Sequence, residues 1–128
     1  MKTILSLVTL LCLCAFASVA ADAPKGKLFH VVSFKYKSDV TDAQKKEVET
    51  AFAALKKSIP QIKSLDYGTN VSPEGFDRGF THMWVLTFDN AADRDAYLVH
   101  SEHKKFGKQL GGKLAEGGVF VVDFVSKE

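Results

Sequence analysis

The stretch LFHVVSFKYKSDVTDAQKKEVETAFAALKKSIP, residues 28–60, decides the fold class, because its hydrophobic period changes once along its length. Residues 28–36 are rich in valine and phenylalanine, which is typical of a strand. Both faces of this strand begin with apolar residues, so we expect it to be covered on both sides. From Thr41 onward the apolar residues follow a helical spacing instead. The domain is therefore expected to open with a strand followed by a helix.

The helix expected over residues 41–59 has recognisable ends. Thr41 and Gln44 have the spacing of a capping box, in which two residues satisfy amide groups that are free at a helix start. Pro60 cannot continue the helix. One apolar stripe has the helical spacings of four, three and four: Val48, Phe52, Leu55 and Ile59.

Three shorter segments follow this helix. Residues 62–71 indicate a weak strand that is broken near Gly68. Residues 72–79 contain proline and glycine and are typical of a loop. Residues 80–88, FTHMWVLTF, alternate two largely apolar faces and predict a strong strand.

The last part of the chain predicts a second helix and a final strand. The helix is expected over residues 90–110, with Asn90 as its N-cap and two glycines after its end. The strand is expected over residues 117–125, with Asp123 inside an otherwise apolar run. We expect Asp123 to satisfy buried backbone groups, and the alternative is that it orients a histidine.

The resulting order of strand, helix, strand, strand, helix, strand predicts the α+β class. It is the order of a ferredoxin-like βαββαβ sandwich, a four-stranded antiparallel sheet with both helices on one face. The other face would then be a large apolar surface that needs a partner. A twofold-symmetric homodimer with facing sheets covers it. We therefore expect a dimeric α/β barrel with the chain itself as partner.

The amino-terminal residues are typical of a targeting sequence. Residues 4–16 are almost wholly apolar, follow Lys2, and precede small residues, which predicts a cleaved signal peptide over 1–21. A membrane anchor is the alternative, but the apolar run is shorter than the roughly 20 residues of a spanning helix. We therefore expect a secreted or periplasmic protein with no membrane segment after cleavage. A flexible lead-in over 22–27 and one domain over 28–126 complete the predicted organisation.

Cysteine positions and charge limit the possible functions. Cys12 and Cys14 both lie in the expected signal peptide, so the mature chain has no thiol for a disulfide or a metal. The chain has 17 basic and 15 acidic residues, for a net charge of +2. Such a balance gives no reason to expect binding of nucleic acid.

Four separated segments carry a resemblance to a known family. They are residues 30–48, HVVSFKYKSDVTDAQKKEV; 68–82, GTNVSPEGFDRGFTH; 88–106, FDNAADRDAYLVHSEHKKF; and 121–124, VVDF. In this order they resemble the stress-responsive dimeric A/B barrel (Dabb) family. The resemblance implies a ferredoxin-like subunit and a barrel built from two subunits, as the order of elements does.

The resemblance also implies a site. The family includes a plant cyclase that closes a linear polyketide by aldol condensation. In that enzyme the second histidine of an H-x-x-H pair acts with an upstream tyrosine, and these positions match His103 and Tyr97. Two further histidines of its pocket match His30 and His82. Barrels of related architecture handle haem, but this rests on fold analogy alone, and we expect no cofactor.

The chemistry of His103 and Tyr97 suits proton transfer. An imidazole can accept and return a proton near neutral pH, and a phenol can donate a hydrogen bond to a carbonyl oxygen that gains charge. On one continuous helix, at about 100° per residue, these side chains would point in different directions. They can converge only if the helix breaks near His100 and Ser101, with Ser101 as a plausible new N-cap.

The other candidates have two interpretations. As ligand-binding residues we predict a set of aromatic and imidazole side chains: His30, His82, Trp84, His100 and Phe106. Each can instead be a packing residue of the core. A metal site is not expected, because His100 and His103 supply only two ligands and the chain has no H-E-x-x-H motif.

Three functions remain open from the sequence. The first is an exported homodimeric barrel that binds a small, partly apolar ligand. The alternative is a cyclase-like or lyase-like enzyme in which His103 and Tyr97 transfer a proton on a carbonyl compound. The enzyme requires both side chains to reach one open cavity. In a third, purely structural protein, the cavity would be filled by side chains such as Phe80, Trp84 and Phe124.

Overall fold

The computed structural model describes residues 26–127. The predicted signal peptide over 1–21 and most of the predicted lead-in over 22–27 lie outside the described residues. The described part contains four strands and three helices. In chain order they are β1 (Leu28–Tyr36), α1 (Asp42–Ser58), β2 (Ser64–Thr69), β3 (His82–Phe88), α2 (Ala91–Val99), α3 (Ser101–Gln109) and β4 (Leu114–Val125).

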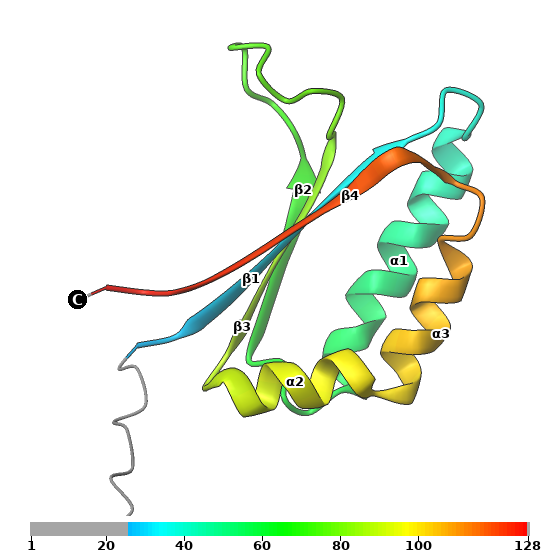
Figure 1. The fold of residues 1–128 in the computed structure, drawn as a ribbon. Helices are drawn as coiled ribbons and strands as arrows, with labels where there is room; N and C mark the ends of the chain where they lie inside the picture. Colours follow the sequence, from blue (N-terminus) through cyan, green and yellow to red (C-terminus); the bar gives the residue numbers. More distant parts are fainter. Residues whose placement is uncertain (1–25, 128) are drawn as a thin grey trace, which may run out of the picture.

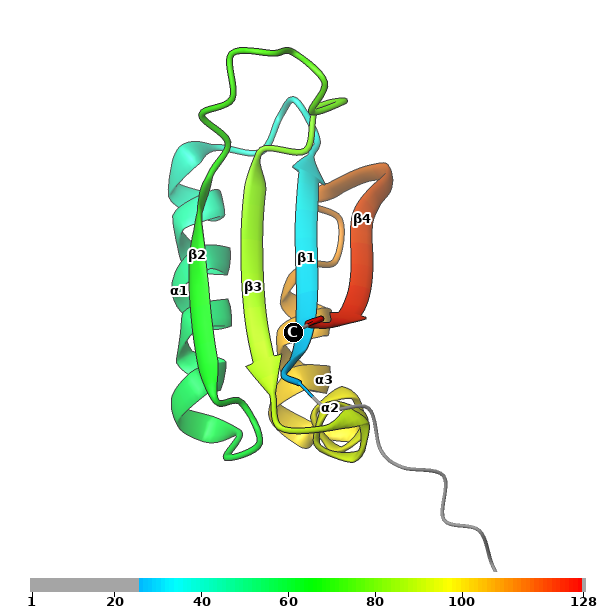
Figure 2. The same ribbon diagram turned by 90° about the vertical axis from the view of Figure 1, so that its left-hand side faces the viewer.

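The strands form one antiparallel sheet in the order β2-β3-β1-β4. All three helices pack on the same face of this sheet (Figure 1), and Figure 2 shows the opposite face without a helix. The predicted ferredoxin-like α+β fold is confirmed. The second helical region differs from the simple pattern, because it consists of two helices that meet at an elbow.

Helix α1 forms for the reasons that its sequence predicts. The Thr41 side chain accepts a hydrogen bond from the Gln44 amide, and the Gln44 side chain accepts one from the Thr41 amide. This capping box satisfies amides that the first turn leaves free. The predicted apolar stripe faces the sheet and is buried: Val48, Phe52, Leu55 and Ile59.

The core lies between the helices and the sheet. Its largest fully buried side chains include Trp84, Leu86 and Phe88 from β3 and Phe34 from β1. These residues alternate along their strands, so every second side chain points to the helices. Burial on this face is the main source of stability that the described fold offers.

Strand β2 is continuous, so the predicted break near Gly68 is wrong. Gly68 pairs with Met83 in the middle of the ladder with β3. β2 is an edge strand, and a side chain added at Gly68 would meet no atom within 4 Å. A glycine in such a place weakens a strand without interrupting it.

Strand β4 begins earlier than the predicted residue 117. Its pairing with β1 is irregular between Phe34 and Tyr36, where the register shifts. Gly117 has a positive φ of 62°, and a Cβ on Gly118 would lie 2.5 Å from the carbonyl oxygen of Lys35. Glycine is needed here because the bulged strand passes so close to β1.

The uncovered face of the sheet is apolar, as predicted. On this face Phe124 lies beside Phe29, and Val122 beside Val31. The Phe124 side chain is half exposed, and so is that of Phe120 on the same strand. Within residues 26–127, no helix combines the length and hydrophobicity that crossing a bilayer requires.

Candidate functional site

The second helical region breaks at His100. The backbone of His100 is extended, with φ −63° and ψ 140°, between the end of α2 and the start of α3. The His100 ring nitrogen Nδ1 accepts a hydrogen bond from the Glu102 amide at 3.2 Å. His100 rather than the predicted Ser101 is therefore the N-cap. An unprotonated imidazole nitrogen can accept this bond as a hydroxyl oxygen does.

This break brings Tyr97 and His103 together. Their ring centroids lie 4.4 Å apart, with the ring planes inclined by 44°. The two residues belong to different helices. The relative direction of their side chains is therefore set by the angle between α2 and α3, and not by the rotation per residue along a single helix (Figure 1). The helix break that Tyr97 and His103 require in order to converge is therefore present.

Tyr97 and His103 line one cavity of about 230 Å³ between the α2–α3 elbow and the sheet. His30 adds a third polar side chain from β1, and the rest of the lining is mainly apolar. The complete lining consists of His30, Val32, Phe34, Phe52, Tyr97, Leu98, His103, Phe106, Gly107, Leu110, Val119 and Val121.

The surroundings of His103 favour its neutral form. Burial is the main cause that lowers the His103 pKa below the usual 6.5, and His30 and His100 lower it further. The Leu98 carbonyl accepts a hydrogen bond from His103 Nδ1 at 3.1 Å and opposes this shift. A carbonyl can only accept, so Nδ1 carries the proton and Nε2 keeps a free lone pair.

The Tyr97 hydroxyl remains protonated at all ordinary pH values. The side chain is almost completely buried, and this burial raises the Tyr97 pKa far above its usual 10. A charged phenolate would lose its hydration there. Tyr97 can therefore act as a hydrogen-bond donor beside the imidazole base.

His30 is held by an ion-pair network that crosses three elements. Its Nδ1 lies 2.6 Å from Asp123 Oδ1 of β4, and Arg94 of α2 binds the other oxygen of the same carboxylate. The expectation that Asp123 satisfies backbone groups is therefore wrong, and the alternative holds. The edge strand β4 brings Asp123 opposite His30 in register with β1.

Comparison with known proteins identifies the family. The model of the stress responsive A/B barrel domain, Dabb, matches residues 28–126. This chain belongs to the Dabb family. Among curated proteins it is 31% identical over 78 residues to olivetolic acid cyclase of Cannabis sativa, which covers 61% of this chain and 77% of the cyclase.

Solved structures of related proteins share the fold. The hydroxynitrile lyase of Passiflora edulis superposes with a TM-score of 0.72 at 25% identity, covering 82% of this chain and 97% of the lyase. A dimeric ferredoxin-like protein of unknown function from Bacteroides fragilis gives 0.64 at 28% identity, covering 80% and 98%. Relatives of this Dabb domain thus include two proteins named as enzymes and one described as dimeric.

The structure separates the predicted ligand-binding residues into two groups. His30 and Phe106 line the cavity with Tyr97 and His103, whereas His82, Trp84 and His100 do not. His100 caps a helix, and His82 Nδ1 bonds to the Thr81 hydroxyl at 2.8 Å.

Trp84 is part of the core of the Dabb domain. Its ring lies 4.6 Å from that of Phe34 and 4.8 Å from that of Phe52, measured between centroids. Its indole Nε1 is buried and has no protein partner in the described structure. The burial of Trp84 agrees with the packing interpretation of this residue, whereas His100 has a third role as a helix cap.

Arg94 is a charged residue of the network behind the cavity that sequence reasoning missed. It lies one helical turn before Tyr97, so spacing on α2 placed it near the cavity. The sequence around Arg94 did not indicate its role, because its partner Asp123 is 29 residues away along the chain.

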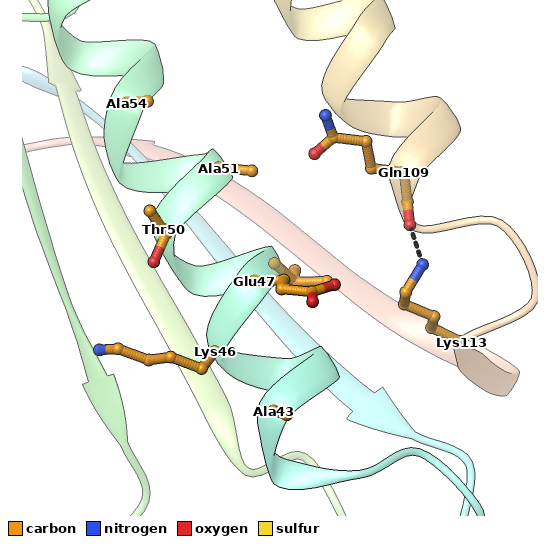
Figure 3. Close-up of a pocket in the computed structure, with 9 residues that line it drawn as sticks. Ala43, Lys46, Glu47, Thr50, Ala51, Ala54, Gln109 and Lys113 are labelled. Atoms are coloured by element: carbon orange, nitrogen blue, oxygen red, sulfur yellow. Dashed lines mark hydrogen bonds between the residues drawn. The ribbon is translucent and has the colours of Figure 1, made fainter.

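Two further observations concern metal ligands and a second groove. Among residues 26–127, no group of three or more His, Cys, Asp and Glu side chains is arranged to hold a metal ion. A larger groove of about 760 Å³ lies on the outer side of α1, beside Gln109 and Lys113 (Figure 3). Lys113 Nζ donates to the Gln109 carbonyl at 2.6 Å. The groove contains no histidine or tyrosine.

Proposed function

We propose that this Dabb domain binds a small, partly apolar carbonyl compound and transfers a proton on it. His103 is the base, and Tyr97 is the hydrogen-bond donor. The observation that carries the proposal is the break at His100, which directs both side chains into one cavity.

The proposed step is an enolisation. The Nε2 lone pair of His103 takes a proton from the carbon next to the carbonyl group. The electron pair of that C–H bond forms a C=C bond, and the carbonyl π pair moves to the oxygen, where Tyr97 donates a hydrogen bond. The C=C pair then forms a C–C bond to a second carbonyl carbon, while the first carbonyl group re-forms from the enolate oxygen. The π pair of the second carbonyl group moves to its oxygen, and the imidazolium returns its proton to this alkoxide.

The shape of the cavity and the relatives support this class of substrate. The polar side chains His30, Tyr97 and His103 leave the rest of the lining apolar, which suits a carbonyl compound with a hydrocarbon portion. The volume of about 230 Å³ suits a small molecule. The names of two relatives, a cyclase and a hydroxynitrile lyase, agree with carbonyl chemistry.

Deuterium exchange tests the proposal without knowledge of the natural substrate. 2-Heptanone in D₂O is the probe, and the rate at which its α-protons exchange is followed by proton NMR. We expect the protein to accelerate the exchange, and His103→Gln to reduce the acceleration by about 10²- to 10⁴-fold, the usual contribution of a general base. Tyr97→Phe is expected to reduce it as well.

Tyr67→Phe is the matched control for Tyr97→Phe, because Tyr67 is an exposed tyrosine on the edge strand β2. It should exchange the probe at the wild-type rate. Equal rates in the wild type and His103→Gln, with both folded, would refute the role of the base.

A binding protein without catalysis is the second candidate. The open cavity also supports this binding function. The cavity argues against the purely structural protein, in which side chains such as Phe80 and Phe124 would fill it, because neither of these residues lines the cavity. Chemical-shift changes of the cavity methyl groups with 2-heptanone, together with no accelerated exchange, would favour this binding function over the enzyme.

The proposed assembly is a homodimer with facing sheets. Support comes from the half-exposed Phe120, Val122 and Phe124 on the face that no helix covers and from dimeric solved relatives. Sedimentation equilibrium at micromolar concentration should give twice the subunit mass. A single-subunit mass would contradict the dimer.

Export with a cleaved signal peptide is also a proposal. It is supported by the basic start, apolar run and small residues over 1–21. The intact mass of protein secreted by a host cell should correspond to a chain that starts after Ala20 or Ala21. Recovery of the uncleaved chain would count against it.

A further inference from the structure

The network around His30 joins a buried side chain to the surface. His30 is 4% exposed and lines the cavity, whereas the side chains of Asp123 and Arg94 are each about a quarter exposed. Asp123 binds His30 through Oδ1 and Arg94 through Oδ2. Neither Asp123 nor Arg94 lines the cavity, so both reach it only through His30.

This arrangement determines which ring nitrogen of His30 carries a proton. An ionised carboxylate accepts hydrogen bonds and donates none, so His30 Nδ1 must be the donor at 2.6 Å. Arg94 keeps a permanent positive charge and pairs with the other oxygen of that carboxylate. Nε2 of the neutral ring is then the nitrogen with the free lone pair.

Tyr97 lies against both imidazoles of the cavity. Its ring centroid is 5.6 Å from that of His30 and 4.4 Å from that of His103. The two histidines come from different layers, one from β1 and one from α3. A carbonyl group held by the Tyr97 hydroxyl would therefore have a second imidazole close to it.

We infer that His30 is a second acid–base group of the cavity, and that Asp123 and Arg94 are its positioning residues. This inference rests on the proposed function. An aldol or related step removes a proton from one atom and delivers a proton to another. With two imidazoles, His103 can take the proton from carbon while the protonated form of His30 supplies one to oxygen. His103 then releases its proton to solvent, and His30 takes one proton up from solvent.

Arg94 has a specific part in this arrangement. Asp123 lies on an edge strand and is partly exposed, so by itself its carboxylate can turn toward water. The guanidinium from α2 holds one oxygen and leaves the other for His30. Arg94 also binds Asp95, which has no contact with the imidazole and so provides a control.

The tautomer of His30 tests the inference directly. In ¹⁵N-labelled wild-type protein, long-range ¹H–¹⁵N spectra above pH 7 should show His30 with its proton on Nδ1. Asp123→Val, which matches the valines before it in β4, should remove this preference. Arg94→Gln should weaken it and Arg94→Lys should restore it in part, while Asp95→Asn should leave it unchanged.

The 2-heptanone exchange assay provides the functional readout. We expect Asp123→Val to slow the protein-catalysed exchange by about tenfold or more, the scale on which removal of an orienting partner acts. Arg94→Gln should slow it less, and Asp95→Asn not at all.

An Nε2-protonated His30 in the wild type would overturn the inference, and this measurement needs no variant to fold. Equal exchange rates in the wild type and a folded Asp123→Val would overturn it as well. Either result leaves the roles of His103 and Tyr97 intact, because His103→Gln and Tyr97→Phe test those roles separately.

Discussion

The two faces of the sheet have similar hydrophobicity but opposite environments. On the covered face, Phe88 of β3 is completely buried under the helices. On the open face, Phe124 of β4 is 51% exposed and stacks on Phe29, at 4.8 Å between ring centroids. The same residue type is thus buried in the core of the subunit on one face and, on the other, is available to the proposed dimer interface.

This difference places the proposed catalytic site and the proposed interface on opposite faces of the sheet. The cavity lies entirely on the covered side, between the sheet and the α2–α3 elbow. The open side retains apolar area that a second subunit can bury without contact with His103 or Tyr97. Variants on the two faces should therefore affect different measurements.

The largest expected effect is on the covered face. Phe88→Ala removes a ring that packs against Tyr97 at 5.3 Å and His30 at 6.3 Å between centroids. We expect a loss of about 3–5 kcal/mol in the free energy of unfolding, from lost burial and the cavity left behind. Urea denaturation followed by circular dichroism measures it at one fixed protein concentration.

Phe124→Ala is the matched control for that variant. Half of its ring is already in solvent in the subunit, so its truncation should destabilise the isolated subunit much less. If the two alanine variants lose the same stability under conditions where the protein is monomeric, the contrast between the faces is incorrect.

The next effect concerns association. Val122→Asp introduces a carboxylate at the middle of the open face, where Val122 pairs with Val31. Burial of an unpaired charge in an interface is unfavourable by several kcal/mol, so we expect the dimer to dissociate. Sedimentation velocity should show the monomer, with an unchanged circular dichroism spectrum. A stable dimer of this variant would place the interface elsewhere.

The smallest effect is a pH dependence confined to the covered side. Burial lowers the pKa values of His82 and His103 below 6.5 in the folded protein. As pH falls below 6.5, the unfolded chain therefore binds more protons than the folded one, and the free energy of unfolding decreases. It should become level about one pH unit or more above 6.5, where the rings are neutral in both states.

Urea titrations at several pH values and NMR titration of each imidazole check this behaviour. His103→Gln should reduce the loss of stability on the acid side, because one of the two groups is removed. The exchange rate of 2-heptanone should also fall at pH values well below 6.5, since neutral His103 is the form proposed to act as the base. A midpoint above 6.5 for His103 would contradict the assigned environment.

Local patterns were enough to predict most of the fold. The capping box at Thr41 and the apolar stripe of α1 depend on residues three or four apart, and both are present. The errors occurred where tertiary contacts decide, as with Gly68, which lies in a paired edge strand. The first residue of β4 was also predicted wrongly, because it depends on a bulge in the pairing with β1. The sequence of β4 alone does not reveal this bulge.

The candidate site was predictable in part for the same reason. Tyr97 and His103 lie six residues apart, and the need for a helix break between them follows from helix geometry alone. The residue that caps the new helix was predicted as Ser101 and is His100, because an imidazole nitrogen can take the same hydrogen bond. His82 and Trp84 share the alternating face of β3 with core residues, so the pattern could not separate lining from packing.

By itself, the sequence determined the order of the elements, the capped first helix, the apolar character of both sheet faces and the family. These properties depend on neighbours along the chain, where periodicity and capping act. Only the tertiary structure decided that Asp123 meets His30 across 93 residues, with Arg94 from α2 on the same carboxylate. Such contacts depend on the register of β4 against β1 and on the angle of the α2–α3 elbow, which are set by packing of the whole domain.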